Sequence, residues 1–116
     1  MSEQDRLAGM LRKVEDIEYY LLQAEGKIVE ALTDRTLKPA IRMQLIALSE
    51  DFTRLAQDGA YHTLSHFDPA DIKGLNAVRN FIAHDYDSVD DEVLEIVLRK
   101  HLPVIKKGIE QALFQF

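Results

Sequence analysis

Four polar side chains that together could handle a phosphodiester lie within eight positions, at Arg79, Asn80, His84 and Tyr86. Arginine is always charged and presents a planar set of donors that matches phosphate oxygens. Histidine has an ordinary pKa near neutrality and can therefore move protons at cellular pH. Tyrosine supplies a hydroxyl that can form a hydrogen bond or be modified. We therefore look for function first in the segment from Arg79 to Tyr86.

Helical geometry divides these four side chains into two pairs. At about 100° per residue, Asn80 and His84 are i, i+4 neighbours on one helix face, where the amide could fix the tautomer of the imidazole. Arg79 and Tyr86 are seven residues apart and share another face. Arg79 and His84 are about 140° apart. One phosphate could meet both only if the arginine wraps around the helix, the helix ends near His84, or another subunit supplies the second group.

The same residues also have structural interpretations. Arg79 could be solvated, or paired with Asp85 or Asp87. His84 could make a favourable contact with the dipole at a helix C-terminus. Tyr86 could be a core residue whose hydroxyl reaches the surface. Spacing alone leaves these interpretations open.

Other histidines and acids give weaker signals. His62 and His66 have an i, i+4 spacing that binds zinc on a helix, but we expect them in a loop without a third ligand. Five acids between positions 85 and 92 could attract magnesium, but helix starts and solvated surface explain them better. The sequence has no glycine-rich phosphate loop. We therefore predict no metal and no cofactor.

Composition limits the class of protein. The 116 residues are 47% hydrophobic and 29% charged, which fits a single domain over residues 1–116 with one core. The absence of cysteine excludes disulfides and thiolate metal sites.

The sequence also indicates where the protein acts. With no signal-peptide pattern and no apolar run of membrane-spanning length, we expect a cytoplasmic protein without membrane contact. The net charge of −6 argues against a general nucleic-acid coat protein, so contact with RNA must be local.

Apolar residues recur every three or four positions, and no alternating strand pattern appears, which predicts an all-α fold. Two core-facing stripes are predicted in this way, one at Ile41, Leu45, Leu48, Phe52 and Leu55 and the other at Ile72, Leu75, Val78 and Ile82. Pro39 fits the first turn of a helix, and Asp68 with Pro69 forms a strong helix start. The predicted segments as far as the motif are a helix over 4–32, a turn over 33–35, a helix ending near 57, a loop over 59–67 and a helix ending near 84.

Two further signals organise the C-terminal part. Ser88 and Asp91 resemble an N-cap and its partner three residues later. Pro103 divides the next apolar face, which carries Val93 and Val97, from a short last helix. We therefore predict a four-helix up-and-down bundle with a short additional C-terminal helix.

The pattern Arg79-x-x-x-x-His84-x-Tyr86, on the third helix of a small all-α domain, resembles the signature of the HEPN superfamily. It is most similar to the version in HepT toxins, and Asn80 agrees with the polar residue that commonly follows the arginine there. The resemblance covers nearly the whole chain. It implies a homodimeric, metal-independent endoribonuclease toxin of a type VII-like toxin–antitoxin system, in which the motifs of two subunits meet in a cleft.

The resemblance also implies a role for each motif residue. Arg79 would bind the phosphate and stabilise the transition state. His84 would act as general base or acid on the ribose 2′-hydroxyl and the leaving oxygen, and Asn80 would orient His84 or the substrate. Tyr86 would be the residue to which an antitoxin, a minimal nucleotidyltransferase of the MntA kind, attaches AMP. The added charge and bulk should block RNA.

Two other functions fit the same residues. The chain could be a non-catalytic partner subunit of a minimal nucleotidyltransferase, in which Arg79 and His84 hold a nucleotide or the substrate of the partner. That function predicts nucleotide binding without RNA cleavage. Alternatively, the chain could be a structural bundle with a degenerate site, which predicts an Arg79 locked in an ion pair and a closed cleft.

Overall fold

The computed structural model describes residues 1–84 and 91–116, with residues 81–84 described for their backbone alone, and these residues fold as helices joined by short turns. The elements are α1 (Glu3–Gln23), α2 (Ile28–Thr33), α3 (Leu37–Gln57), α4 (Tyr61–Leu64), α5 (Pro69–His84), α6 (Asp91–Ile96), the π-helical turn η1 (Val97–His101) and α7 (Leu102–Leu113). The predicted all-α class is confirmed. None of the described helices is both long and apolar enough to cross a membrane.

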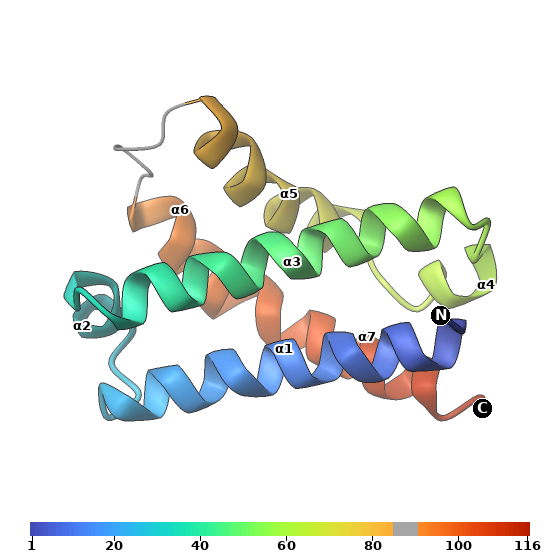
Figure 1. Cartoon of the computed structure of the whole chain (residues 1–116), viewed down its shortest axis with the longest axis horizontal. Coiled ribbons are helices and arrows are strands. Elements are labelled where there is room, and N and C mark those ends of the chain that lie inside the picture. The colour runs from blue at the N-terminus through green and yellow to red at the C-terminus, as the bar shows by residue number, and fades with distance from the viewer. Residues whose placement is uncertain (85–90) are drawn as a thin grey trace.

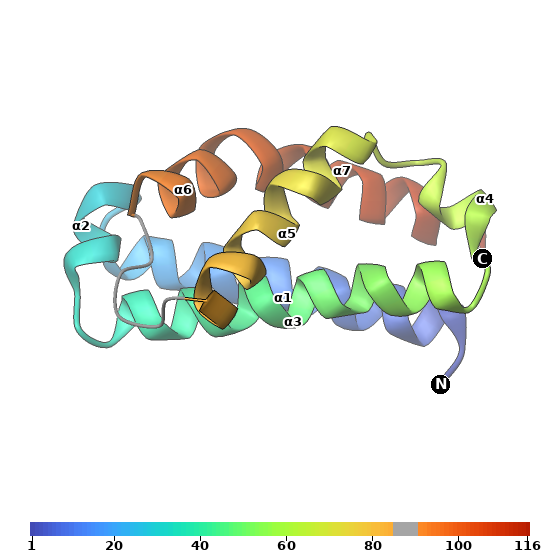
Figure 2. The ribbon, with the colours of Figure 1, turned by 90° about the horizontal axis from the view of Figure 1, so that it is seen from above.

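The helices form a bundle in which successive long segments run in opposite directions. α1, α3, α5 and the run from α6 to α7 alternate along the longest axis (Figure 1). Viewed from above, α5 crosses obliquely between α3 and the α6–α7 run (Figure 2). This crossing brings the segment that carries Arg79 against the C-terminal half of α3.

The core is built from the apolar stripes that the sequence predicts. On α3 the whole predicted stripe is buried, namely Ile41, Leu45, Leu48, Phe52 and Leu55. On α5, Leu75 and Val78 are buried as predicted, whereas Ile72 is only partly buried. Ile82, which was also expected in the core, has a side chain outside the described residues. Each fully buried side chain of this size contributes about 1.5–3 kcal/mol, so these stripes hold α3 and α5 together.

The single helix predicted over 4–32 is two helices. Glu25 and Gly26 have left-handed φ angles of 57° and 76°. The N–H of Gly26 donates to Leu21 O at 2.8 Å and the N–H of Glu25 donates to Leu22 O at 3.0 Å. These two bonds form a Schellman motif, which ends a helix. The prediction was wrong because apolar spacing continues through the motif into α2.

The start of α3 agrees with the predicted turn at 33–35. Asp34 Oδ1 accepts hydrogen bonds from the N–H groups of Thr36 at 2.8 Å and Leu37 at 2.9 Å. The N–H of Leu37, and then that of Thr36, holds the pKa of the Asp34 carboxyl below its ordinary value. Pro39 lies in the first turn of α3, as predicted, where its missing N–H has no helical partner to lose.

The loop predicted over 59–67 contains the one-turn helix α4. The buried Thr63 donates from Oγ1 to Glu3 Oε2 at 2.7 Å, which joins this turn to the start of α1. One turn is too short to show periodicity, and the contact that supports it comes from a residue 60 positions away. The predicted start of α5 is confirmed, because Asp68 Oδ1 accepts from the N–H of Ala70 at 2.9 Å.

The predicted break at Pro103 is also wrong. α6, η1 and α7 follow one another without an intervening turn, and Pro103 is the second residue of α7. The π-helical turn just before it changes the local hydrogen-bond pattern, so the helical run tolerates a residue without an N–H. The predicted short additional helix is therefore the end of a longer run. Ser88, the predicted cap, lies outside the described residues.

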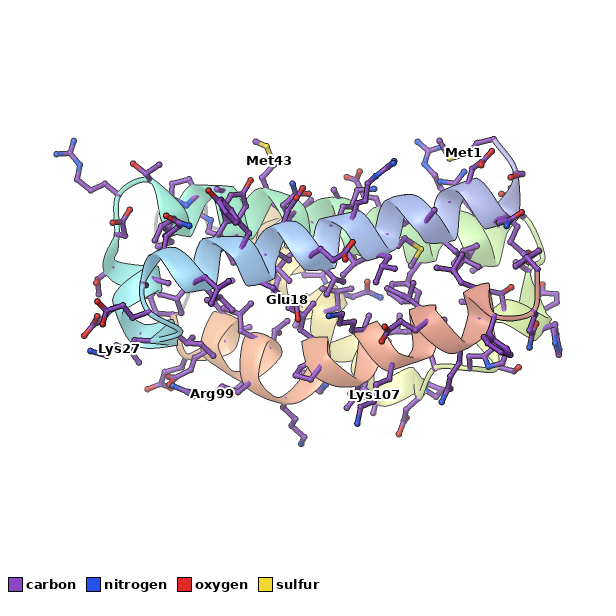
Figure 3. All side chains as sticks on the ribbon, turned by 90° about the horizontal axis from the view of Figure 1, so that it is seen from below. Met1, Glu18, Lys27, Met43, Arg99 and Lys107 are labelled. Carbon is purple, nitrogen blue, oxygen red and sulfur yellow. The ribbon has the colours of Figure 1, made fainter. Side chains whose placement is uncertain are left out.

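Charged pairs tie the C-terminal run to the first helix. Lys106 Nζ lies 2.9 Å from Glu18 Oε1, and Figure 3 shows Glu18 between α1 and the C-terminal helices. The hydrogen bond to the Glu18 carboxylate raises the pKa of Lys106 above its ordinary value. On the other side of α1, the buried Asp51 of α3 lies 2.6 Å from Lys13 Nζ and 3.4 Å from Arg6 Nη1.

Candidate functional site

Arg79 lies on the exposed side of α5, facing the C-terminal half of α3. Its Nη1 donates to Thr53 Oγ1 at 3.4 Å, and the Thr53 hydroxyl donates to the backbone carbonyl of Ser49 at 3.3 Å. The guanidinium is therefore directed across the junction between the two helices. An open groove of about 270 Å³ follows this junction, and we call it the α3–α5 groove; its lining residues are Glu50, Thr53, Arg54, Gln57 and Arg79.

A partly buried hydrogen bond joins the two helices beneath this groove. Ser49 on α3 is fully buried, and its hydroxyl donates to Asn76 Oδ1 on α5 at 2.5 Å. Asn76 lies one helical turn before Arg79 and Asn80. The half-buried Asn76 thereby supplies the partner that the buried hydroxyl of Ser49 needs. This bond therefore specifies the register in which α5 presents Arg79 to α3.

A second contact holds the start of α5 against the π-helical turn. His101 Nδ1 lies 2.7 Å from Asp71 Oδ1, and both side chains are nearly buried at 12% and 13% exposure. The imidazole of His101 packs directly over Gly74, where a Cβ would come within 2.6 Å of its Cδ2. The absence of a side chain at Gly74 allows this close approach. α5 is therefore held from two sides before it reaches Arg79.

The structure describes the side chains of two of the four predicted site residues. Arg79 and Asn80 are both exposed near the end of α5. His84 is the last residue of α5 that the structure describes. The side chain of His84 lies outside the described residues, as does Tyr86. The Asn80–His84 hydrogen bond and all four residue roles therefore stay predictions.

The α3–α5 groove carries local positive charge on an acidic chain. Two arginines and one glutamate line it, whereas the whole chain has a formal net charge of −6. Within residues 1–84 and 91–116, neither Arg54 nor Arg79 forms a salt bridge with a carboxylate. The other partners considered for Arg79, Asp85 and Asp87, lie outside the described residues. A groove of this charge can accept an anion.

Sequence reasoning missed the α3 side of this groove. Its four lining residues on α3 have the i, i+3, i+4, i+7 spacing of a single helix face, namely Glu50, Thr53, Arg54 and Gln57. That polar stripe was visible in the sequence as the face opposite the apolar one. Only the packing of α5 on α3 shows that it meets Arg79.

The histidine pair noted in the sequence lies at α4. His62 belongs to α4 and His66 follows it, so the expectation that both lie in a loop was wrong for His62. Their rings meet edge to face with centroids 5.7 Å apart. In the part of the chain that the structure describes, no group of three or more histidine or acidic side chains is arranged to hold a metal ion.

Comparison with known families agrees with the resemblance of the motif. Residues 10–112 match the family model described as Ribonuclease HepT-like. The matched range includes the α3–α5 groove and the whole motif segment. No curated protein and no solved structure matches the chain. Because the family model covers nearly the entire sequence, including the groove and Arg79, this chain belongs to the HepT-like ribonuclease family.

Proposed function

We propose that this protein is an endoribonuclease toxin that cleaves RNA without a metal ion, using Arg79, Asn80 and His84. The observation that carries the proposal is the position of Arg79, which lines an open groove on a chain of the HepT-like ribonuclease family. The family match supports it further, because it covers residues 10–112 and so includes Asn80 and His84. The proposed site of action is the cytoplasm.

The proposed reaction is an attack of the ribose 2′-hydroxyl on the adjacent phosphorus. His84 takes the proton of the 2′-hydroxyl, the new O–P bond forms and the P–O5′ bond breaks. The departing 5′-oxygen receives a proton from a histidine acting as acid, which leaves a 2′,3′-cyclic phosphate and a 5′-hydroxyl. Arg79 stabilises the charge that develops on the phosphate oxygens. Asn80 holds the imidazole of His84, or the substrate, in position.

A homodimer supports this chemistry better than a single chain. The reaction needs a base and an acid, whereas each motif supplies one histidine. On one helix Arg79 and His84 also point about 140° apart. If the motifs of two subunits face each other, the site contains two histidines, and Arg79 of one subunit can meet His84 of the other.

Regulation is the second part of the proposal. We place the toxin in a type VII-like toxin–antitoxin system, where an MntA-like nucleotidyltransferase attaches AMP to Tyr86. Tyr86 lies two residues after His84, so an attached AMP would stand beside the reacting groups. Its negative charge and its bulk would repel and block the RNA backbone.

Replacement of the two reactive groups tests the nuclease directly. Arg79→Ala and His84→Ala should each reduce RNA cleavage at least about 10²-fold, because each removes a group used in the transition state. Cleavage is measured with purified protein in excess chelator, and relief of growth arrest is measured in cells. Arg99→Ala and His62→Ala are matched controls, since both side chains are exposed and do not line the groove.

Cleavage at the wild-type rate by both Arg79→Ala and His84→Ala would contradict the proposed mechanism. Loss of wild-type cleavage in chelator would contradict metal independence. Tight nucleotide binding by a protein that cleaves no RNA would instead favour the non-catalytic partner subunit.

The same two substitutions, combined in one chain, test whether a site is shared between subunits. A purified dimer of one wild-type chain and one chain with both Arg79→Ala and His84→Ala should lose nearly all cleavage if each site needs groups from both chains. About half of the wild-type rate would show instead that each chain builds its own site.

A further inference from the structure

We propose that Arg54 forms a second phosphate-binding position beside Arg79, so that the α3–α5 groove holds the backbone of a single RNA strand next to the cleaved bond. This inference rests on the proposed ribonuclease function and extends it to the mode of substrate binding. Arg54 would be a binding residue, because it lies outside the motif that carries the reaction.

The position of Arg54 follows from the contacts of its neighbour. Thr53 accepts the hydrogen bond from Arg79, and Arg54 is the next residue on α3. Both arginines are exposed and line the same groove, but they come from different helices. The Ser49–Asn76 hydrogen bond lies one turn below and holds those helices in register. The two guanidinium groups are therefore presented to one ligand by a rigid base.

The charge of Arg54 is available to a ligand. Glu50 precedes it by four residues on α3, a spacing that often produces an ion pair. Within the described ranges, however, Arg54 forms no salt bridge with Glu50 or with any other carboxylate. A guanidinium in an open groove is well suited to a phosphate, which it can bind through two parallel donors.

The order of the lining residues indicates the path of the RNA strand along the groove. Glu50 and Gln57 are seven residues apart on α3, which corresponds to about 10 Å along the helix. The Glu50 carboxylate repels phosphate at one end, whereas the Gln57 amide offers donors at the other. A strand bound at Arg79 should therefore continue past Arg54 toward Gln57. A groove of this length favours successive nucleotides over a single phosphate.

A binding experiment with an uncleavable strand tests this inference. The probe is a fluorescent single-stranded RNA whose 2′-hydroxyl groups are methylated, so that it cannot react. Arg54→Ala should weaken binding about tenfold, and the slope of log affinity against log salt should fall by about 0.7, as expected for one lost phosphate contact to a single strand. Arg54→Lys should recover part of both losses. With cleavable RNA, Arg54→Ala should raise KM more than it lowers kcat.

Arg99→Ala is the matched control, because Figure 3 shows Arg99 on the C-terminal helices, away from α3. It should keep the wild-type salt slope. If Arg54→Ala and the wild type bind the methylated RNA with equal affinity and equal salt slope, the inference is overturned. RNA cleavage by the wild type would then still support the proposed nuclease function.

Failure of the proposed function can be separated from failure of the inference. If the wild type binds the methylated strand through Arg54 but cleaves no RNA, the phosphate-binding position is supported and the proposed nuclease function is contradicted. If the wild type neither binds nor cleaves, both are overturned. Tighter binding of a mononucleotide than of the strand would overturn the inference alone.

Discussion

At the scale of single residues, the position of α5 depends on a glycine that faces an imidazole. Gly74 has no Cβ, and His101 occupies the space where a Cβ would stand. The same imidazole lies 2.7 Å from Asp71, so it cannot move away without losing that contact. The close approach of α5 to the π-helical turn is therefore decided by one residue type at one position.

Gly74→Ala should lower the free energy of unfolding by about 1–3 kcal/mol, because the added methyl group overpacks the contact with His101. Gly9→Ala is the matched control. A Cβ at Gly9 meets only Arg12 Nη2 at 3.9 Å, so alanine should stabilise this helix-interior position by about 0.5–1 kcal/mol. Urea unfolding of the three proteins measures both changes. A Gly74→Ala variant as stable as the wild type would contradict the packing described for His101.

At the scale of elements, the α3–α5 groove depends on how two helices are joined. The apolar stripes of α3 and α5 bury both helices, but apolar contacts tolerate small sliding movements. The Ser49–Asn76 hydrogen bond does not, since it requires two specific atoms to meet at 2.5 Å. The alignment of Arg79 with Thr53 and Arg54 therefore rests on a polar pair in an otherwise apolar contact.

Ser49→Ala should cost about 0.5–1.5 kcal/mol of folding free energy, because the hydrogen bond to the partly buried Asn76 is lost. We also expect slower RNA cleavage, since α5 can then shift relative to α3. Ser65→Ala removes an equivalent hydroxyl at an exposed position, and its free energy of unfolding should stay within about 0.5 kcal/mol of the wild type. Urea unfolding and a cleavage assay report the two effects. Unchanged stability and unchanged cleavage in Ser49→Ala would argue against a role of this hydrogen bond in fixing the register of α5 on α3.

At the scale of the whole molecule, the relevant balance is between an acidic chain and a locally basic groove. A net charge of −6 repels RNA at long range. Binding must then depend on a few arginines at short range, and it should weaken as salt rises. Such a balance is easily reversed, because one additional negative group near the groove removes much of the attraction. The proposed attachment of AMP at Tyr86 would act in this way.

Coexpression with the proposed antitoxin, an MntA-like nucleotidyltransferase, should raise the intact mass by one or more AMP units, and peptide mapping should place them on Tyr86. Tyr86→Phe should prevent the increase and should keep RNA cleavage active in the presence of the partner. Tyr61→Phe is the control, since Tyr61 is 73% exposed and lies in α4. An unchanged mass, or full cleavage by the modified protein, would contradict the proposed switch.

The sequence by itself determined the helices and the motif, because both are local properties. Periodic apolar residues predicted the stripe on α3, and Asp68 with Pro69 marked the start of α5. The predictions failed where local patterns carry no information. The stripe of α1 continued into α2 through the left-handed Glu25 and Gly26, and a π-helical turn allowed the chain to pass Pro103 as a helix.

Only the tertiary structure decided which side chains share a site. Arg79 was identifiable from its neighbours in the sequence, whereas Thr53 and Arg54, 26 and 25 residues earlier, were not. Nothing local to α3 indicates that its polar face meets Arg79, because that depends on the angle and register of α5. Those are set by long-range contacts, in which Asn76 meets Ser49 and His101 meets Asp71 over Gly74. The motif consists of residues close together in the sequence, whereas the groove beside it forms only when helices far apart in the sequence pack against each other.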